Sequence, residues 1–425
     1  MAPQSSKVGK QPAAPTPGHD LRSQAESLGS ELQDRLSNLI AQMPRRILGP
    51  QALVDTLDGI NIVTASRLLK GLGQKDSIAT LQLLPGPKPL QKIVDVALEI
   101  GVDPEIAGAA TEAIQHFDRF IREQSGDRSS LKAMLSAWLP EERREFENQR
   151  RQTIFKARHE LEGVSSELEL DGVLLHPSAQ EGSIDIVAIK ALFGIDRIRP
   201  DAIVKLGTRR MLSSEDEKAA AEGKGKDRLP TTLDGDLAYD GLHSIFLEDF
   251  CASPPAPLVA ERIGMSMHYS LGPTGFGPMS RVDLVVAEVN RAEMKNHGPA
   301  ESHKPHFWVI PEMPSRKLVF DVLVHEDVYV GRVPHLYFYD TTGQGPAAAG
   351  DPARRLDQRK FTHSIEAIGK DLRRLRLLEF PAYGQLKAKI FKKLGWDSSK
   401  FRAYRVAITY PLTGIQVSLS FHPAE

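Results

Sequence analysis

The chain has 425 residues, which is too long for one ordinary domain and predicts two or three. Its composition, with 41% hydrophobic and 26% charged residues, is that of a soluble globular protein. Lys and Arg number 54 against 55 Asp and Glu, so a uniformly basic coat for nucleic acid is excluded. A local basic patch is not excluded, because binding responds to the charge on one face.

The chain contains one cysteine, Cys251, which excludes an internal disulfide framework and a cysteine-rich zinc site. Its sequence context carries no cue for activation, so we expect an inert thiol. No apolar run approaches the roughly 18 residues that span a bilayer. The N-terminal stretch MAPQSSKVGKQPAAPTPGHD lacks the apolar core of a secretory signal. We therefore expect a cytoplasmic protein without a membrane partner.

The N-terminal part of the chain predicts a helical domain after a short tail. Residues 1–26 are rich in Pro, Ser, Gln and Ala, which predicts a disordered tail. From residue 27 to about 160, apolar side chains recur at helical spacing. The first apolar face, expected either to pack within the domain or to form a dimer contact, comprises Leu28, Leu32, Leu36, Leu39, Ile40 and Met43.

The pattern changes after residue 160. Residues 161–212 are richer in β-branched side chains and predict a mixed α/β segment. The charged run at 213–228 predicts a flexible loop or linker. Residues 229–425 alternate apolar and polar side chains between turn signals, which predicts an antiparallel β-rich domain, a sandwich or barrel, with a covering helix near 362–394. The expected fold class is α+β.

The stretch GINIVTASRLLKGLGQ, residues 59–74, predicts an amphipathic helix with a cationic outer side. Its apolar stripe consists of Ala65, Leu68, Leu69 and Leu72. The opposite side carries Val63, Ser66, Arg67, Lys70 and Gln74, with no carboxylate among them. Asn61 stands where an N-cap belongs, and Gly59 suits the tight turn after a short preceding helix.

A short helix, a glycine-containing turn and a second helix with a cationic face follow the order of a helix-turn-helix. Residues 51–73 resemble the helix-turn-helix regulators of bacteria, especially the winged-helix kind, through LVDTL, Gly59-Ile60-Asn61 and TASRLL. Asp58 adds one residue to the usual spacing. The resemblance implies that the second helix enters the major groove of double-stranded DNA. Such regulators commonly act as homodimers on two half-sites.

The cationic side chains suit two kinds of DNA contact. Arg67 can donate two hydrogen bonds to a guanine edge, and Lys70 can pair with a phosphate. The following stretch, DSIATLQLLPGPKPLQ, would supply a degenerate wing with Lys88 near its tip. The predicted DNA-binding residues are Asn61, Thr64, Ser66, Arg67, Lys70, Gln74 and Lys88.

No catalytic or metal motif stands out in the C-terminal part. The histidine group His303, His306, His325 and His335, with Asp327, lacks the spacing of known metal sites. The glycine-rich LGPTGFGP at 271–278 lacks the Gly-Lys-Ser/Thr of a phosphate loop. We expect no metal, no cofactor and no catalytic residue.

The sequence favours a DNA-binding transcriptional regulator whose C-terminal region senses a small-molecule effector or mediates assembly. The alternative is a protein–protein interaction or assembly protein with a purely structural helical region. An enzyme in the β-rich region is a third class, for which the sequence offers no motif.

Overall fold

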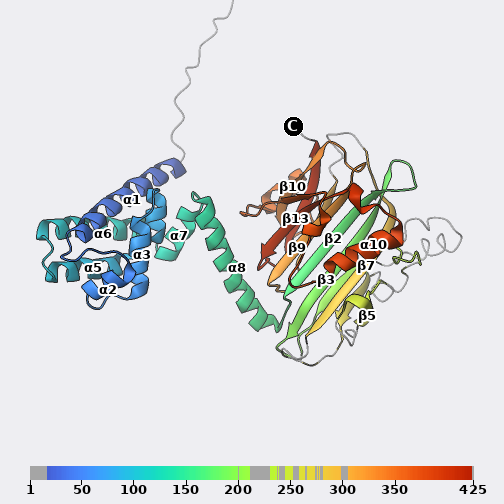
Figure 1. Cartoon of the computed structure of the whole chain (residues 1–425), viewed down its shortest axis with the longest axis horizontal. Helices are drawn as coiled ribbons and strands as arrows, with labels where there is room; N and C mark the ends of the chain where they lie inside the picture. The colour runs from blue at the N-terminus through green and yellow to red at the C-terminus, as the bar shows by residue number, and fades with distance from the viewer. Residues whose placement is uncertain are drawn as a thin grey trace, which may run out of the picture. The chain divides into compact units, whose positions relative to one another are not determined.

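The computed structural model describes residues 17–199, 201–210, 230–236, 238, 245–251, 258–263, 266–272, 275, 277, 281–297 and 305–423. The chain divides into two compact units, residues 1–146 and 147–425. The described part of the first unit is helical, and the second unit is β-rich with mixed sheets (Figure 1). The expected order of a helical part before a β-rich part is confirmed. The predicted linker at 213–228 lies outside the described residues.

The helices of the first unit are α1 (Pro17–Ala41), α2 (Pro50–Thr56), α3 (Ile62–Leu72), α4 (Ser77–Leu83), α5 (Pro87–Glu99), α6 (Pro104–Gln124) and α7 (Arg128–Ser136). Helix α8 (Pro140–Glu162) begins in the first unit and ends in the second. Helix α1 starts earlier than predicted, so the tail prediction was wrong for residues 17–26. The reason is that Leu21 and Ala25 continue the apolar stripe and pack in the core.

One apolar core holds the first unit together. Helix α1 packs against α4 and α6, and α3 packs against α2 and α4. The leucine face of α1 is buried in this core, with Leu28, Leu32, Leu36 and Leu39 all nearly inaccessible. Gly29 permits the close approach of α1 to α4, because a Cβ atom there would lie 2.0 Å from the carbonyl oxygen of Ser77. The face considered as a dimer contact therefore packs within its own unit.

The described strands of the second unit are β1 (Val164–Ser165), β2 (Leu168–Pro177), β3 (Ser183–Arg197), β4 (Lys205–Arg210), β5 (Leu258–Ile263), β6 (Ser266–Leu271), β7 (Val282–Lys295), β8 (His306–Val309), β9 (Lys317–His325), β10 (Arg332–Asp340), β11 (Gln358–Arg359), β12 (Glu366–Gly369), β13 (Phe401–Thr409) and β14 (Ile415–Pro423). The described helix of this unit beyond α8 is α10 (Tyr383–Leu394). Residues 163–199 and 201–210 carry strands and no helix, so within the described part of 161–212 the only helical residues are the last two of α8.

The main sheet has seven strands in the order β1-β3-β2-β9-β13-β12, with β7 also paired to β3. Strands β2 and β9 run parallel, so the sheet is mixed and not purely antiparallel as predicted. Helix α10 packs on one face (Figure 1). On the other face, a second apolar core is shared with the four-stranded sheet β11-β10-β14-β8. A smaller sheet, β4-β6-β5, contributes to a third core on that side.

The helix predicted near 362–394 is present only in its last part, as α10. Its first part is strand β12 followed by a short 3-10 turn at Leu372–Arg374. Gly369 has a φ of +74°, which ends the strand, and Asp371 caps the turn by accepting from the Arg373 N–H. Pro381 then lies directly before Ala382, the N-cap of α10. Pairing of β12 with β13 outweighs the local helical spacing of the leucines.

A buried ion pair joins two central strands to α10. Asp321 on β9 is fully buried and accepts two hydrogen bonds from Arg405 on β13, both of 2.7 Å. The hydroxyl of Tyr383 donates to the same carboxylate at 2.9 Å. Arg405 also donates to the carbonyl oxygen of Arg376, in the segment before α10. These bonds fix the start of α10 over the sheet.

No helix in the described residues has the length and apolar character required to cross a bilayer.

We predict that Asp321→Ala lowers the free energy of unfolding of the second unit by about 3 kcal/mol or more, because it leaves Arg405 buried without its partner. Tyr383→Phe removes one hydrogen bond and is expected to cost about 1 kcal/mol. Urea unfolding followed by tryptophan fluorescence measures both. Asp327→Ala is the control, since that side chain is 72% exposed. Equal losses in Asp321→Ala and the control would contradict the anchoring role.

Candidate nucleic-acid surface and a charged pocket

The turn between α2 and α3 forms as the sequence predicted. Gly59 has a φ of +73°, a conformation that favours glycine. Asn61 is the N-cap of α3, and its side-chain oxygen accepts from the Thr64 N–H at 2.8 Å. Ile62 and Val63 follow in the first turn with exposed side chains. The first turn of α3 therefore lies at the surface of the unit.

The segment from Gly59 to Val94 is cationic. It contains five basic residues, Arg67, Lys70, Lys75, Lys88 and Lys92, and one acidic residue, Asp76. Asp76 is engaged as the N-cap of α4, where it accepts from the N–H groups of Ile78 and Ala79. All four lysines are exposed. The segment thus presents positive charge around a carboxylate that already has partners.

Arg67 is only partly available. It is half-buried, and its guanidinium donates to the carbonyl oxygen of Leu84 at 3.2 Å. Arg128 donates to the same carbonyl at 3.0 Å. Burial, and then the neighbouring Arg67, lower the pKa of Arg128 to about 10. Arg67 therefore helps to satisfy the C-terminal end of α4, a structural role that the sequence did not indicate.

The other predicted DNA-binding residues lie on α3, directly after its C-cap, and on α5. Thr64 and Ser66 are half-buried, whereas Lys70 is exposed. Gln74 donates from its side chain to the Lys70 carbonyl, and its own carbonyl accepts from Gln33. Lys88 is exposed in the first turn of α5.

The wing prediction was wrong. The stretch expected to form it consists of helices α4 and α5, because Asp76 caps the first and Pro87 opens the second. Lys88 consequently lies on a helix and not at the tip of a hairpin.

The described members of the predicted histidine group do not lie together in the structure. His325 lies on β9 beside His176, with ring centroids 4.7 Å apart, whereas His335 lies on β10 beside His422. His306 is on β8, in the same sheet as His335, and His303 is outside the described residues. Within the described parts of the chain, no three His, Cys, Asp or Glu side chains are placed to hold a metal ion.

Cys251 is half-buried near the start of β7. Its sulfur donates to the Leu247 carbonyl oxygen and accepts from the Val285 N–H. Burial raises the pKa of the thiol to about 11, so it is protonated at neutral pH.

A charged pocket of about 590 Å³ opens on the main-sheet face opposite α10. We call it the sheet pocket. Its floor includes Asp171 on β2, Lys190 on β3 and Glu288 on β7, and register pairs the first two directly. Its described lining residues also include Leu206, Ile245, Tyr269, Trp308, Val309, Ile310, Glu312, Thr341 and Pro346. The described lining residues therefore come from six strands, β2, β3, β4, β6, β7 and β8, and from the segments between strands.

Glu169 lies beside the sheet pocket and is buried. Lys190 Nζ is 3.3 Å from its Oε1 atom, and Ser315 Oγ is 3.5 Å from its Oε2 atom. Burial raises the pKa of Glu169 to about 7, although Lys190 opposes this effect. Burial also raises the pKa of Asp171. A site with such perturbed carboxylates is a candidate for function.

The sequence contained a signal for this pocket that we did not use. Charged residues interrupt otherwise apolar strands in LELDGVLL, IVAIKALFGI and VVAEVN. A charge within a strand that is covered on both faces needs a partner or a cavity. The pairing of these strands could not be derived from the spacing alone.

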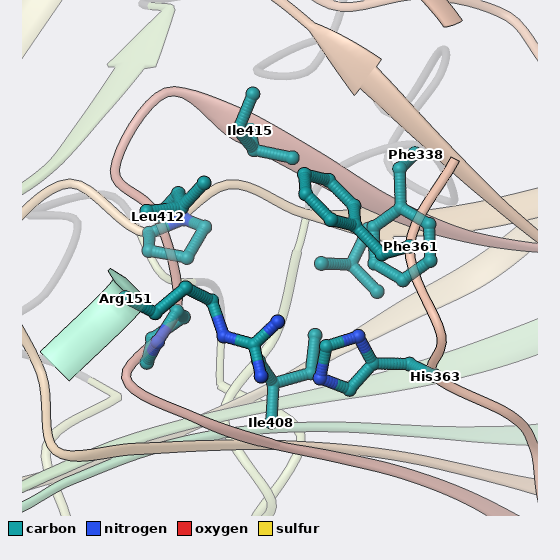
Figure 2. A pocket seen from close by; sticks show the side chains of 10 residues that line it. Arg151, Phe338, Phe361, His363, Ile408, Leu412 and Ile415 are labelled. Atoms are coloured by element: carbon teal, nitrogen blue, oxygen red, sulfur yellow. The ribbon is translucent and has the colours of Figure 1, made fainter. Parts of the chain in front are cut away.

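A second pocket surrounds Arg151 of α8 and is too small for a ligand. Figure 2 shows the guanidinium beside the His363 ring, among Phe361, Leu412 and Ile408. The cavity volume is about 20 Å³, enough for about one water molecule. Arg151 donates to the Thr409 carbonyl oxygen at 3.2 Å and lies 3.6 Å from Glu147. Its role is to fasten α8 to the β-rich unit.

No protein-family model matches this chain, and no curated protein sequence matches it.

We predict that Glu169→Gln changes how stability depends on pH. The folded chain raises the pKa of Glu169 from 4.5 to about 7, so it holds the proton more tightly than the unfolded chain does. This contribution to stability is complete below pH 4.5 and is lost as pH rises to about 7. Relative to Glu169→Gln, the natural chain should lose on the order of 3 kcal/mol across this range.

Chemical denaturation at several pH values measures this difference. Histidine titrations occur in both proteins and cancel. Lys190, Asp171 and Glu312 face Glu169 in both proteins. Glu293→Gln, at an exposed position of β7, is the control and should run parallel to the natural chain. Parallel curves for Glu169→Gln would contradict the raised pKa.

Proposed function

We propose that this protein is a DNA-binding regulator whose helical unit contacts duplex DNA and whose β-rich unit senses a small molecule. The observation that carries the proposal is the cationic segment from Gly59 to Val94, whose one carboxylate, Asp76, is engaged within the unit. The order α2, Gly59 turn, α3 supports a helix-turn-helix arrangement. The formal net charge of −1 makes this concentration of positive charge a local feature.

Contacts to the phosphate backbone are the favoured mode. Lys70, Lys75 and Lys88 are exposed, and each can neutralise a phosphate. The first turn of α3 has exposed side chains, and the N-terminus of a helix favours an anion, while the Thr64 N–H in this turn already donates to Asn61. Arg67, which we expected to contact guanine, already donates to Leu84. The proposal therefore shifts from reading base edges with Arg67 to contacting phosphates with the lysines.

Dimerisation on two half-sites would require a surface other than the leucine face of α1. That face lies in the core of its own unit. A homodimer would therefore have to form through a surface other than this face.

An assembly function is the second candidate. It is favoured by large apolar side chains that stay exposed on the β-rich unit, namely Val330, Leu356 and Leu378. Single exposed apolar residues are common on monomers, so this observation is the weaker of the two. Size-exclusion chromatography over a range of concentrations separates the candidates, because an assembly protein gives a large particle.

We predict that Lys70→Ala with Lys88→Ala weakens binding to duplex DNA about tenfold at low salt and lowers the slope of log affinity against log salt by about 2. Fluorescence anisotropy with labelled duplexes at several salt concentrations measures both. Arg22→Ala with Arg35→Ala removes the same charge from exposed positions on α1 and serves as the control. If the natural chain shows no affinity for duplex DNA at low salt, the proposal is wrong.

We predict that Arg67→Ala lowers the free energy of unfolding of the helical unit by about 1 kcal/mol, because the Leu84 carbonyl loses one donor. Its effect on DNA affinity should be no larger than that of one lysine and should be the same for all sequences. Thermal unfolding and binding to several unrelated duplexes test this. Unchanged stability combined with lost sequence preference would instead identify Arg67 as a base-reading residue.

A further inference from the structure

The sheet pocket has the size of a small-molecule site. One of the carboxylate oxygens that line it has no hydrogen-bond partner. We propose that it binds a small organic cation, a molecule with an ammonium or guanidinium group on an apolar body. This inference specifies the small molecule that the β-rich unit would sense. Binding of the cation does not depend on the proposed function; only an effect of the cation on DNA binding does.

The charge of the pocket favours a cation. Its described lining residues carry three carboxylates, those of Asp171, Glu288 and Glu312, against the one ammonium group of Lys190. Glu312 pairs with Lys205 at 3.0 Å, and Lys190 pairs with the adjacent Glu169. An anion would compete with Glu169 for Lys190 and would approach the carboxylates of the floor. The pocket therefore selects for positive charge.

Asp171 supplies the most specific argument. Its Oδ2 atom is buried and has no hydrogen-bond partner. A buried acceptor without a donor is costly, and a charged N–H donor is the group that relieves this cost best. Burial raises the pKa of Asp171, Lys190 opposes this effect, and Glu312 adds to it, so the positive charge nearby does not fully offset the burial of the carboxylate. An ammonium or guanidinium group at this oxygen would satisfy both its charge and its hydrogen bond.

The remaining walls define the other end of the ligand. Leu206, Ile245 and Val286 are apolar and buried, and Trp308 is 45% exposed at the pocket. A tryptophan ring attracts a cation or stacks on an aromatic body. The volume of about 590 Å³ lies within the usual range for small-molecule sites. Because the acidic groups of the described residues are not placed to hold a metal ion, the cation is organic.

Isothermal titration calorimetry on the full chain tests the inference without DNA, so this result and that of the DNA experiment are independent. The probes are three cations, phenethylamine, agmatine and choline. Phenethyl alcohol and 3-phenylpropionate are the neutral and anionic counterparts of the first. At least one cation should bind saturably, and at least about tenfold more tightly than either counterpart. Failure of all three cations to do so would overturn the proposal, as would preferential binding of 3-phenylpropionate.

Two variants locate the bound cation. Asp171→Asn keeps the shape of the side chain and should weaken binding of that probe about tenfold or more. Trp308→Leu should weaken it about fivefold, and its exposed position makes folding of this second variant secure. Glu293→Gln, on β7 but outside the pocket, should leave binding unchanged. Unchanged affinity in both Asp171→Asn and Trp308→Leu would place the cation elsewhere and overturn the proposal.

Discussion

The ion pair between Asp321 and Arg405 is the constraint on which the arrangement of the β-rich unit depends. A fully buried carboxylate is tolerated only with charged and hydrogen-bonding partners, and here Arg405 and Tyr383 provide them. Tyr383 is the first residue of α10, so the bond orients that helix as well as the two strands. Helix α10 covers this face of the sheet, and the sheet pocket opens on the opposite face.

Two groups of buried charge therefore lie on opposite faces of one sheet, and they differ in how completely they are satisfied. The carboxylate of Asp321 receives hydrogen bonds on both oxygens. Asp171, on the neighbouring strand β2, keeps one oxygen without a partner. Full satisfaction is typical of a structural network, whereas a missing partner beside a cavity is typical of a binding site. The contrast supports Asp171 as the carboxylate that contacts the proposed cation.

Sequence patterns predicted the elements that are determined by residues close to one another in the sequence. Leucines at helical spacing predicted α1, and Asn61 predicted the start of α3, because an N-cap acts within one turn. The prediction of a helix near 362–394 was wrong for its first part because β12 pairs with β13, and this pairing cannot be seen in the local sequence. The prediction of a wing was wrong because Asp76 caps α4 and Pro87 begins α5.

The candidate sites were harder to predict than the helices. Arg67 is half-buried, and its bond to Leu84 depends on the packing of α3 against α4. The pocket requires β2, β3 and β7 to be neighbours, and Glu288 is far from Asp171 in the sequence. Pairing of this kind follows from the whole fold and not from any one segment.

Helix α8 crosses the boundary between the units without interruption, since the division falls after Phe146 and the helix runs from Pro140 to Glu162. Its later turns belong to the β-rich unit, where Glu147 accepts from Thr362 and Phe155 packs on Tyr410. If the two units are expressed separately, the later turns of α8 must stay with the β-rich unit. A fragment beginning at the first strand would uncover Tyr410 and remove the Arg151 donor from Thr409. A β-rich fragment should therefore begin upstream of Glu147 to keep its own surface covered.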